Sequence, residues 1–387
     1  PHRGLTCDRI SYRAYGSVPM TQPPPPGGPY QPQPPWTPPP GQPWPPPGPP
    51  PKQGNGWKWA LGAVALLAVV GVTVAVTLSV SGNSLSDSQV SDSKSLPPAS
   101  DSDSTGIASA DDTGPISLIT EDPSCAPVRP ILETRAAVQR NGWNERDASI
   151  PATEWTPEMR AQFDAVGESM RASAEQLVPI AKLTPHRVMR QLYEQLIAYS
   201  TAYADALPTY TAADDILAVV SATTGNAISN ICGAIDYGSA AARAPLVEPV
   251  SGALDPAPVR APSEARPFLS EVNPVCEDWM AAISRFQRDI KDWAATSPNI
   301  PAGEWSPEQR SLNEKVAPVM RRIASEMQAL GSRSGNSTLQ DFADLAALYR
   351  NAYVEALPTY TPADKYLSSA SLLVSGVVDA ACEAAGT

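Results

Sequence analysis

The sequence predicts an all-α protein with two tandem Cys-bounded four-helix bundles, preceded by one transmembrane helix and disordered segments. Three observations lead to this prediction. Two stretches of the chain repeat each other at an offset of 150 residues. Within each copy, apolar residues recur every three to four positions, which is the period of an amphipathic helix. Four cysteines lie near the ends of the copies, so that one pair bounds each copy.

Residues 1–58 form the first predicted segment, a disordered proline-rich tail. Between residues 23 and 51, 18 of 29 residues are proline, which excludes helices and sheet ladders and favours extended polyproline II. The tail is either a docking segment for a cytoplasmic partner with an aromatic-lined groove or a spacer. The composition changes abruptly at Met20. The true start is therefore either Met20, with residues 1–19 as translated upstream sequence, or the tail includes them.

Residues 59–80 form the predicted transmembrane helix. These 22 residues contain no charged residue and no proline, and about 20 apolar residues cross the hydrocarbon core of a bilayer. The run is longer than the apolar part of a cleavable signal peptide. Lys52 and Lys58 precede it, so the positive-inside rule places the N-terminus in the cytoplasm. We therefore expect a single-pass plasma membrane protein with the lipid bilayer as a partner and its C-terminal domains outside the cytoplasm.

Residues 81–124 form a predicted flexible linker. They carry one Lys and eight Asp/Glu and are rich in serine, a composition that cannot bury a core of its own. We expect this acidic linker to separate the bundles from the membrane surface.

The rest of the chain is a tandem duplication. Residues 150–160 read IPATEWTPEMR and residues 300–310 read IPAGEWSPEQR. Residues 202–214 read AYADALPTYTAAD and residues 352–364 read AYVEALPTYTPAD. Self-similarity at a fixed offset is the mark of a repeated structural unit. It predicts bundle repeat 1 at residues 125–234, a Pro/Ala-rich linker at residues 235–275 and bundle repeat 2 at residues 276–385.

Each copy is expected to fold into four helices. Prolines and capping residues separate the segments: Ser306-Pro307 fits a helix start, and Pro208 and Pro358 end the third helix. The apolar stripes that predict the bundle helices are Met159, Phe163, Val166, Met170 and Leu177; Val188, Leu192, Leu196, Tyr199 and Tyr203; Trp279, Ile283, Phe286, Ile290 and Trp293; and Val316, Met320, Ile323, Met327 and Leu330.

The cysteines fit this topology. In an up-down four-helix bundle the start of the first helix and the end of the last helix lie at the same end of the bundle. Of the three pairings that four cysteines allow, the repeat favours Cys125–Cys232 and Cys276–Cys382. Disulfides persist in oxidising compartments, so this pairing supports a location outside the cytoplasm.

Charge and histidine content restrict the function. The net charge is −12, and residues 125–387 carry 31 Asp/Glu against 22 Lys/Arg, which argues against a nucleic-acid partner. The whole chain has two histidines, His2 and His186, so histidine-based catalysis or a histidine-rich metal site is not expected. We predict no catalytic residues, no metal and no cofactor.

The candidate site lies at the end of each bundle opposite the cysteines. There the loop between the first and second helices meets the loop between the third and fourth. One interpretation is a ligand or partner surface made of Glu154, Trp155 and Tyr210, with a twin made of Glu304, Trp305 and Tyr360. The other is that the aromatic rings only plug the end of the bundle.

One part of the chain resembles a known kind of protein. The stretch MTQPPPPGGPY, followed by PPPGPPPKQGNGWKWALGAVALL and the acidic linker, is similar in layout to proline-rich single-pass membrane proteins of mycobacteria and related actinobacteria. The resemblance covers residues 20–124 and implies a role at the cell envelope. It implies no catalytic residues, and the helical repeat matches no family of known activity.

These observations favour a non-enzymatic, membrane-anchored envelope protein whose duplicated bundles bind an unknown envelope protein or ligand. One alternative is a carrier of an apolar envelope ligand, which requires a large cavity inside each bundle. Another is a hydrolase acting on the envelope through carboxylates such as Glu154 and Glu158, which requires acids that converge on a cleft.

Overall fold

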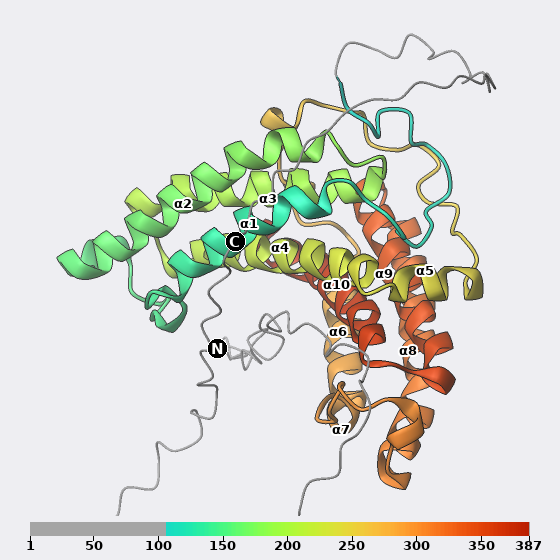
Figure 1. Cartoon of the computed structure of the whole chain (residues 1–387). Helices are drawn as coiled ribbons and strands as arrows, with labels where there is room; N and C mark the ends of the chain where they lie inside the picture. The colour runs from blue at the N-terminus through green and yellow to red at the C-terminus, as the bar shows by residue number, and fades with distance from the viewer. Residues whose placement is uncertain (1–105, 387) are drawn as a thin grey trace, which may run out of the picture. The chain divides into compact units, whose positions relative to one another are not determined.

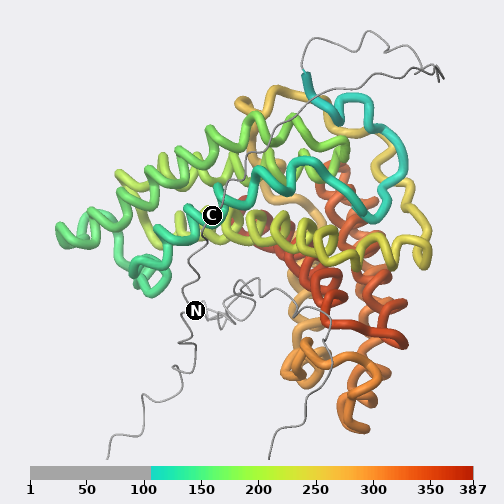
Figure 2. Tube along the Cα trace, in the orientation of Figure 1, coloured from blue at the N-terminus to red at the C-terminus, as the bar shows by residue number. Residues whose placement is uncertain are grey.

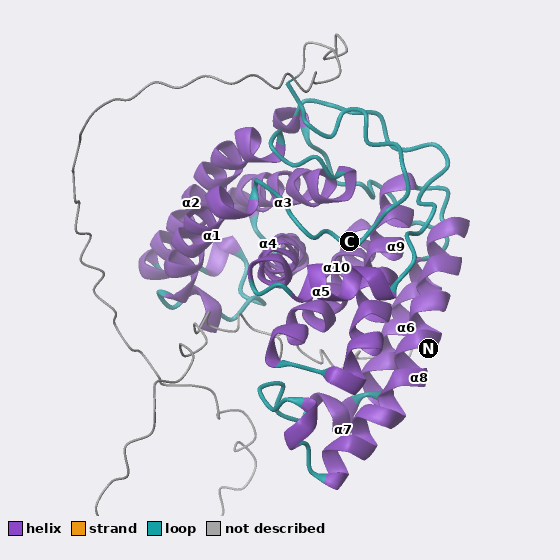
Figure 3. Ribbon diagram, turned by 45° about the vertical axis from the view of Figure 1, so that its right-hand side comes forward, coloured by secondary structure: helices purple, strands orange, loops and turns teal. Residues whose placement is uncertain are grey.

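The computed structural model describes residues 106–386 (Figure 1). This part of the chain consists of helices and connecting segments without a β-strand (Figure 3); a single antiparallel bridge joins Ile116 and Val250. The all-α prediction is therefore confirmed. The predicted tail, the transmembrane helix at residues 59–80 and residues 81–105 of the predicted linker lie outside the described residues.

Four long helices make up each copy, as predicted, and repeat 2 has a fifth, very short one. Repeat 1 contains α1 (Cys125–Arg140), α2 (Pro157–Ala181), α3 (Arg187–Ala206) and α4 (Asp215–Asp236). Repeat 2 contains α6 (Cys276–Asp289), the short α7 (Lys291–Ala294), α8 (Pro307–Arg333), α9 (Ser337–Ala356) and α10 (Lys365–Ala385). The short α5 (Ser239–Arg243) lies between the copies.

Local sequence explains where these helices begin and end. The hydroxyls of Thr156 and Ser306 cap α2 and α8 by accepting hydrogen bonds from the backbone N–H three residues later, which satisfies one of the free donors of a helix start. The third helix of each copy ends two residues before Pro208 or Pro358, as predicted. The apolar stripes point inward: of the residues that predicted them, only Met159 and Trp293 are not buried.

Each copy is closed by a disulfide. Cys125 is bonded to Cys232 and Cys276 to Cys382, across sequence separations of 107 and 106 residues. These are the pairs that the repeat favours. The bonds join the start of the first helix to the end of the last, at the bundle end opposite the candidate site.

The last helices of the two copies pack against each other. Near the end of α4, a Cβ atom on Gly233 would lie 2.5 Å from the Tyr366 ring near the start of α10, so the two helices run antiparallel. Because α4 and α10 are equivalent in the repeat, this contact resembles the isologous interface of a twofold dimer within one chain. Figure 1 and Figure 3 show the pair at the centre, and one hydrophobic core continues through both copies.

The same pair is apolar enough to meet the requirements of a membrane span. Within the described residues, Ala212–Asp236 and Pro362–Ala385 have the necessary length and a mean hydropathy of 1.3. In each, 67% of the apolar window is buried inside the protein. Packing of these helices in the core accounts for their hydropathy.

The two predicted linkers need correction. Residues 106–124, which we name the strap, belong to the folded region: Ile116, Leu118 and Ile119 are buried. The segment between the copies also packs on the helices, with Leu269 and Val275 in the core. Figure 2 shows the strap running alongside the segment between the copies. Short apolar runs inside polar segments supply these contacts, so the copies form one compact unit and not two tethered domains.

A buried ion pair connects these parts. Arg187 of α3 and Asp341 of α9 are 2% and 0% exposed, and the Arg187 Nε lies 2.8 Å from an Asp341 oxygen. Asp341 also accepts hydrogen bonds from Gln191 Nε2 and the Ala253 backbone N–H. Arg187 in turn donates to the Asp112 carbonyl of the strap. Repeat 1, repeat 2, the strap and the segment between the copies therefore meet at a single carboxylate and its guanidinium.

Asp344, one turn further along α9, gives a prediction of pH dependence. Burial, followed by the nearby charge of Asp341, raises the pKa of Asp344 to about 6. At neutral pH the ionised side chain therefore destabilises the fold by about 3 kcal/mol, because one pKa unit corresponds to ~1.4 kcal/mol. This penalty is absent below the ordinary pKa of 3.8 and grows as the pH rises towards 6. We expect Asp344→Asn to stabilise the protein at pH 7.5.

Urea unfolding of the wild type and Asp344→Asn at pH 4, 5, 6 and 7.5 tests this expectation. The difference in unfolding free energy should shrink as the pH falls and should vanish near pH 4. A difference that stays constant with pH would show that the carboxylate is not the cause.

Each bundle also buries one arginine that has no carboxylate partner in the described region. Arg135 on α1 donates to the hydroxyls of Ser200 and Ser221, and burial lowers its pKa to about 10. Arg350 on α9 lies over the Phe286 ring at 4.5 Å, and burial lowers its pKa to about 9. The two arginines come from different helices of the repeat.

Candidate functional site

The two loops at the candidate end meet in both copies. The Ala152 N–H donates to the Tyr210 carbonyl, and in repeat 2 the Ala302 N–H donates to the Tyr360 carbonyl, both at 2.9 Å. The Pro before each of these alanines starts a short 3-10 turn that directs the following tryptophan towards the tyrosine. Glu154 and Glu304 stay exposed to solvent beside this contact.

In repeat 1 the end of the bundle is closed by aromatic rings. Trp155 is stacked on Phe163 with ring centroids 4.0 Å apart, and Tyr210 lies 5.3 Å from both rings. The Phe163 side chain is fully buried and Trp155 is only 8% exposed. The Tyr210 hydroxyl donates to the Ala148 carbonyl. This arrangement is a packed plug.

Charged groups complete the closure of repeat 1. The Arg146 guanidinium lies 3.4 Å from the centroid of the Trp143 ring and forms an ion pair with Asp215. The Tyr210 hydroxyl, whose one proton is shared with the Ala148 carbonyl, also lies 3.2 Å from an Asp215 carboxylate oxygen. This carboxylate adds to burial in raising the pKa of Tyr210 far above its usual value. The Arg146 guanidinium, the Asp215 carboxylate and the Tyr210 hydroxyl therefore each have a partner inside the protein, whereas the buried Trp143 Nε1 has no hydrogen-bond partner among the described residues.

In repeat 2 the corresponding end is open. A pocket of about 240 Å³ lies between the aromatic rings and the start of α10. At the offset of 150 residues, Asn313 takes the place of Phe163, Thr296 that of Arg146, and Lys365 that of Asp215. The full lining is Asn230, Trp293, Ala294, Thr296, Ser297, Pro298, Trp305, Gln309, Asn313, Tyr353, Tyr360, Lys365, Ser368, Ser369, Leu372 and Leu373.

The walls of the pocket are held by hydrogen bonds. Trp293 Nε1 donates to the Asn313 side-chain oxygen at 3.0 Å, and Asn313 Nδ2 donates to the Gln309 carbonyl. Trp305 Nε1 donates to the Ile300 carbonyl. The Tyr360 hydroxyl donates to the Pro298 carbonyl at 2.6 Å. The rings are therefore fixed in position before any ligand binds, which lowers the entropic cost of binding.

The chemistry of the pocket is aromatic and cationic. Trp305 and Tyr360 have ring centroids 5.6 Å apart. Lys365 is the charged residue of the lining, which contains no Asp or Glu. Its ammonium donates to the Asn299 side chain and takes part in none of the ion pairs found in the described region. The pocket is thus suited to an aromatic or apolar group that carries negative charge.

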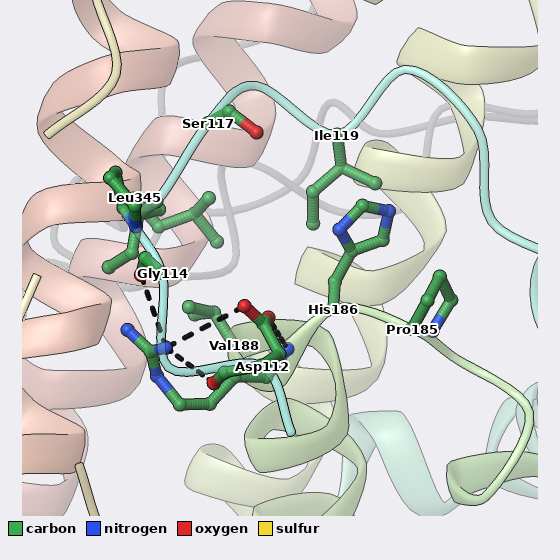
Figure 4. A pocket seen from close by; sticks show the side chains of 11 residues that line it. Asp112, Gly114, Ser117, Ile119, Pro185, His186, Val188 and Leu345 are labelled. Atoms are coloured by element: carbon green, nitrogen blue, oxygen red, sulfur yellow. Dashed lines mark hydrogen bonds and ion pairs between the residues drawn. The ribbon is translucent and has the colours of Figure 1, made fainter. Parts of the chain in front are cut away.

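A second pocket, of about 110 Å³, lies where the strap passes the start of α3 (Figure 4). Asp112, Ile119, His186 and Leu345 contribute to its lining. Dashed lines in Figure 4 join the Arg187 guanidinium to Asp112 and to the Gly114 carbonyl. These groups already bond to each other, so this pocket belongs to the contacts that hold the strap against α3.

The structure also places the residues on which the hydrolase and carrier alternatives depend. Glu154 and Glu158, the carboxylates named for a hydrolase, both belong to repeat 1 and are exposed, and neither lines the pocket of repeat 2. Within the described residues no group of three His, Cys, Asp or Glu side chains could hold a metal ion. The bundle axes are filled with buried side chains such as Met170, Leu177 and Met327, whereas the 240 Å³ pocket lies at a bundle end.

Sequence reasoning missed several residues of the open pocket. Trp305 and Tyr360 were expected there and line it, but Trp293, Asn313 and Lys365 were not named as site residues. The signal that could have found two of them is a difference between the copies: an amide where the twin has an aromatic ring, and a cation where it has an acid.

Comparisons with known proteins show which family the chain resembles. Residues 107–386 match the model of a family described as mycobacterial ESX-1 associated protein. An uncharacterized protein of Mycolicibacterium smegmatis (strain MKD8) is 52% identical over 338 residues, which cover 86% of this chain and 88% of that relative. That alignment is longer than the family match and includes residues before 107. The mycobacterial part of the resemblance is confirmed, although these matches name no proline-rich single-pass family. No solved structure matches.

Proposed function

The chain belongs to the mycobacterial ESX-1 associated protein family, and on that premise we propose that it is a non-enzymatic accessory protein of ESX-1 secretion in the cell envelope. It binds a protein of the secretion machinery through the open end of repeat 2. The observation that carries this proposal is the difference between the copies: the same bundle end is plugged in repeat 1 and forms a 240 Å³ pocket in repeat 2.

Pocket composition supports a protein partner. Tryptophan and tyrosine dominate binding hot spots because they bury a large area with few rotatable bonds. In this pocket Trp305 is half-buried, whereas its twin Trp155 is buried, so part of its ring is available for contact. An all-helical scaffold with a fixed aromatic pocket at one end is a suitable receptor for a protruding side chain.

The proposal includes a location. Residues 59–80 anchor the chain in the plasma membrane, with the N-terminus in the cytoplasm and the bundles outside. The uncharged run of 22 residues and the preceding lysines favour this orientation, and the two disulfides fit an oxidising compartment. Labelling of single introduced cysteines at residues 30 and 110 with a membrane-impermeant reagent on intact cells tests it. Labelling at residue 30 but not at residue 110 would contradict this orientation.

Filling the pocket tests the binding site. Asn313→Phe introduces the side chain that repeat 1 has at this position, so the fold has a precedent for it. We expect the variant to stay folded, although Trp293 Nε1 loses its acceptor. It should lose affinity for the partner at least tenfold, since an interface hot spot contributes about 2 kcal/mol or more. Export of ESX-1 substrates to the culture medium should fall in parallel.

Photocrosslinking gives the matched comparison. A crosslinking amino acid at Glu304 lies beside the open pocket, and one at Glu154 lies at the same place beside the closed end. We expect ESX-1 components, identified by mass spectrometry, to crosslink at residue 304 and not at residue 154, and only when residue 313 is Asn. Equal crosslinking at both positions, or crosslinking that Asn313→Phe does not reduce, would refute the proposed site.

A further inference from the structure

We infer that the pocket of repeat 2 receives an aromatic side chain flanked by an acidic residue on the partner protein. This inference rests on the proposed function and adds the chemistry of the occupant. Its basis is that repeat 1 shows the same bundle end in a filled state. The side chains that close repeat 1 and are replaced in repeat 2 define what the occupant has to supply.

The first missing group is an aromatic ring. Phe163 lies flat against Trp155, with an interplanar angle of 22°, and Asn313 leaves the corresponding space beside Trp305 empty. The volume of about 240 Å³ is large enough for an aromatic ring, since an apolar cavity of about 150 Å³ in another protein binds benzene. An incoming ring would therefore stack on Trp305 as Phe163 stacks on Trp155.

The second missing group is a charge of the opposite sign. In repeat 1, Arg146 and Asp215 neutralise each other at the edge of the plug. In repeat 2, Lys365 occupies the place of Asp215, while Thr296 occupies that of Arg146 and carries no charge. An acidic group on the occupant would restore the ion pair with its polarity reversed. The lining offers no carboxylate that would repel it.

Blocked tetrapeptides test this inference on the full-length protein in detergent micelles. The probes are Ac-Gly-Phe-Asp-Gly-NH2, the same peptide with Lys in place of Asp, and the same peptide with Ala in place of Phe. Titration calorimetry should show the Phe-Asp peptide binding at least fivefold more tightly than either of the others. Asn313→Phe should abolish this binding.

Charge reversal provides the decisive control. Lys365→Glu should invert the preference, so that the Phe-Lys peptide becomes the tighter ligand. Lys315→Glu changes the net charge by the same amount at an exposed position of α8 outside the pocket and should leave the preference unchanged. Equal affinity for all three peptides, or inversion by Lys315→Glu, would overturn the inference.

Three further outcomes distinguish a protein occupant from a small molecule, and failure of this inference from failure of the proposed function. If 3-phenylpropionate, a free aromatic acid, bound more tightly than the Phe-Asp peptide, the occupant would be a small molecule and the inference would fail. If Asn313→Phe reduced crosslinking to ESX-1 components but the peptides showed no charge preference, the inference alone would fail. If crosslinking did not depend on residue 313, the proposed function would fail whatever the peptides showed.

Discussion

Replacing Asp341 with alanine should lower the free energy of unfolding by about 3–5 kcal/mol. The reason is that the substitution leaves Arg187, which is 2% exposed, as an uncompensated buried charge. It also removes the acceptor of Gln191 and of the Ala253 N–H. Because these donors come from repeat 1 and from the segment between the copies, the loss should weaken the joint between the two halves of the fold. Urea unfolding followed by circular dichroism measures the change.

A surface ion pair supplies the matched control. Arg322 and Asp289 form a pair at 2.9 Å whose side chains are 63% and 44% exposed, and exposed pairs contribute about 0–1 kcal/mol. Asp289→Ala should therefore change stability only slightly. The double variant Arg187→Met with Asp341→Leu should recover much of the loss, because it removes both buried charges. If Asp341→Ala were as mild as Asp289→Ala, the ion pair would not stabilise the joint.

Removing either disulfide should cost about 4–5 kcal/mol. Each bond closes a loop of just over 100 residues, and the chain-entropy model assigns about 4.7 kcal/mol to a loop of that size. The double variants Cys125→Ser/Cys232→Ser and Cys276→Ser/Cys382→Ser should be destabilised by similar amounts, since the separations differ by one residue. Thermal and urea unfolding of each, beside the wild type with and without reductant, measures the effect.

The comparison with reduced protein guards against an artefact of substitution. All four sulfur atoms belong to buried residues, so serine could destabilise by burying a hydroxyl. Reductant acts on the wild-type sequence and should give a loss close to that of both double variants together. If reduced protein melted at the temperature of oxidised protein, the entropic account of these bonds would be wrong.

Much of the fold could be predicted from the sequence because its determinants are local or repeated. The period of Val188, Leu192 and Leu196 marks a buried helix face, and Thr156 and Ser306 mark helix starts. The cysteine pairing followed from the duplication together with the topology of a bundle. Each of these inferences rests on a local pattern or on the likeness of the two copies.

Contacts outside the repeated bundle pattern are what the sequence did not reveal. The strap has only a short group of apolar residues, Ile116, Leu118 and Ile119, inside a polar stretch, and so short a group has no period to detect. Its place became clear only when Ile116 was seen to bridge Val250. The pocket was missed in part because comparison of the repeats emphasised what they share, such as Trp155 and Trp305, whereas the pocket depends on where they differ.

The buried arginines have a consequence for the inheritance of the duplicated gene segment. Phe286 lies as far from Cys276 as Arg135 lies from Cys125, and Arg350 is the counterpart of Ser200. One core thus takes its arginine from the first helix, the other from the third. A crossover that fused the start of one copy to the end of the other would place two arginines in one core, or none. Either recombinant would lose the pairing of Arg135 with Ser200 and that of Arg350 with Phe286. Selection against such recombinants would help to keep both copies in the genome.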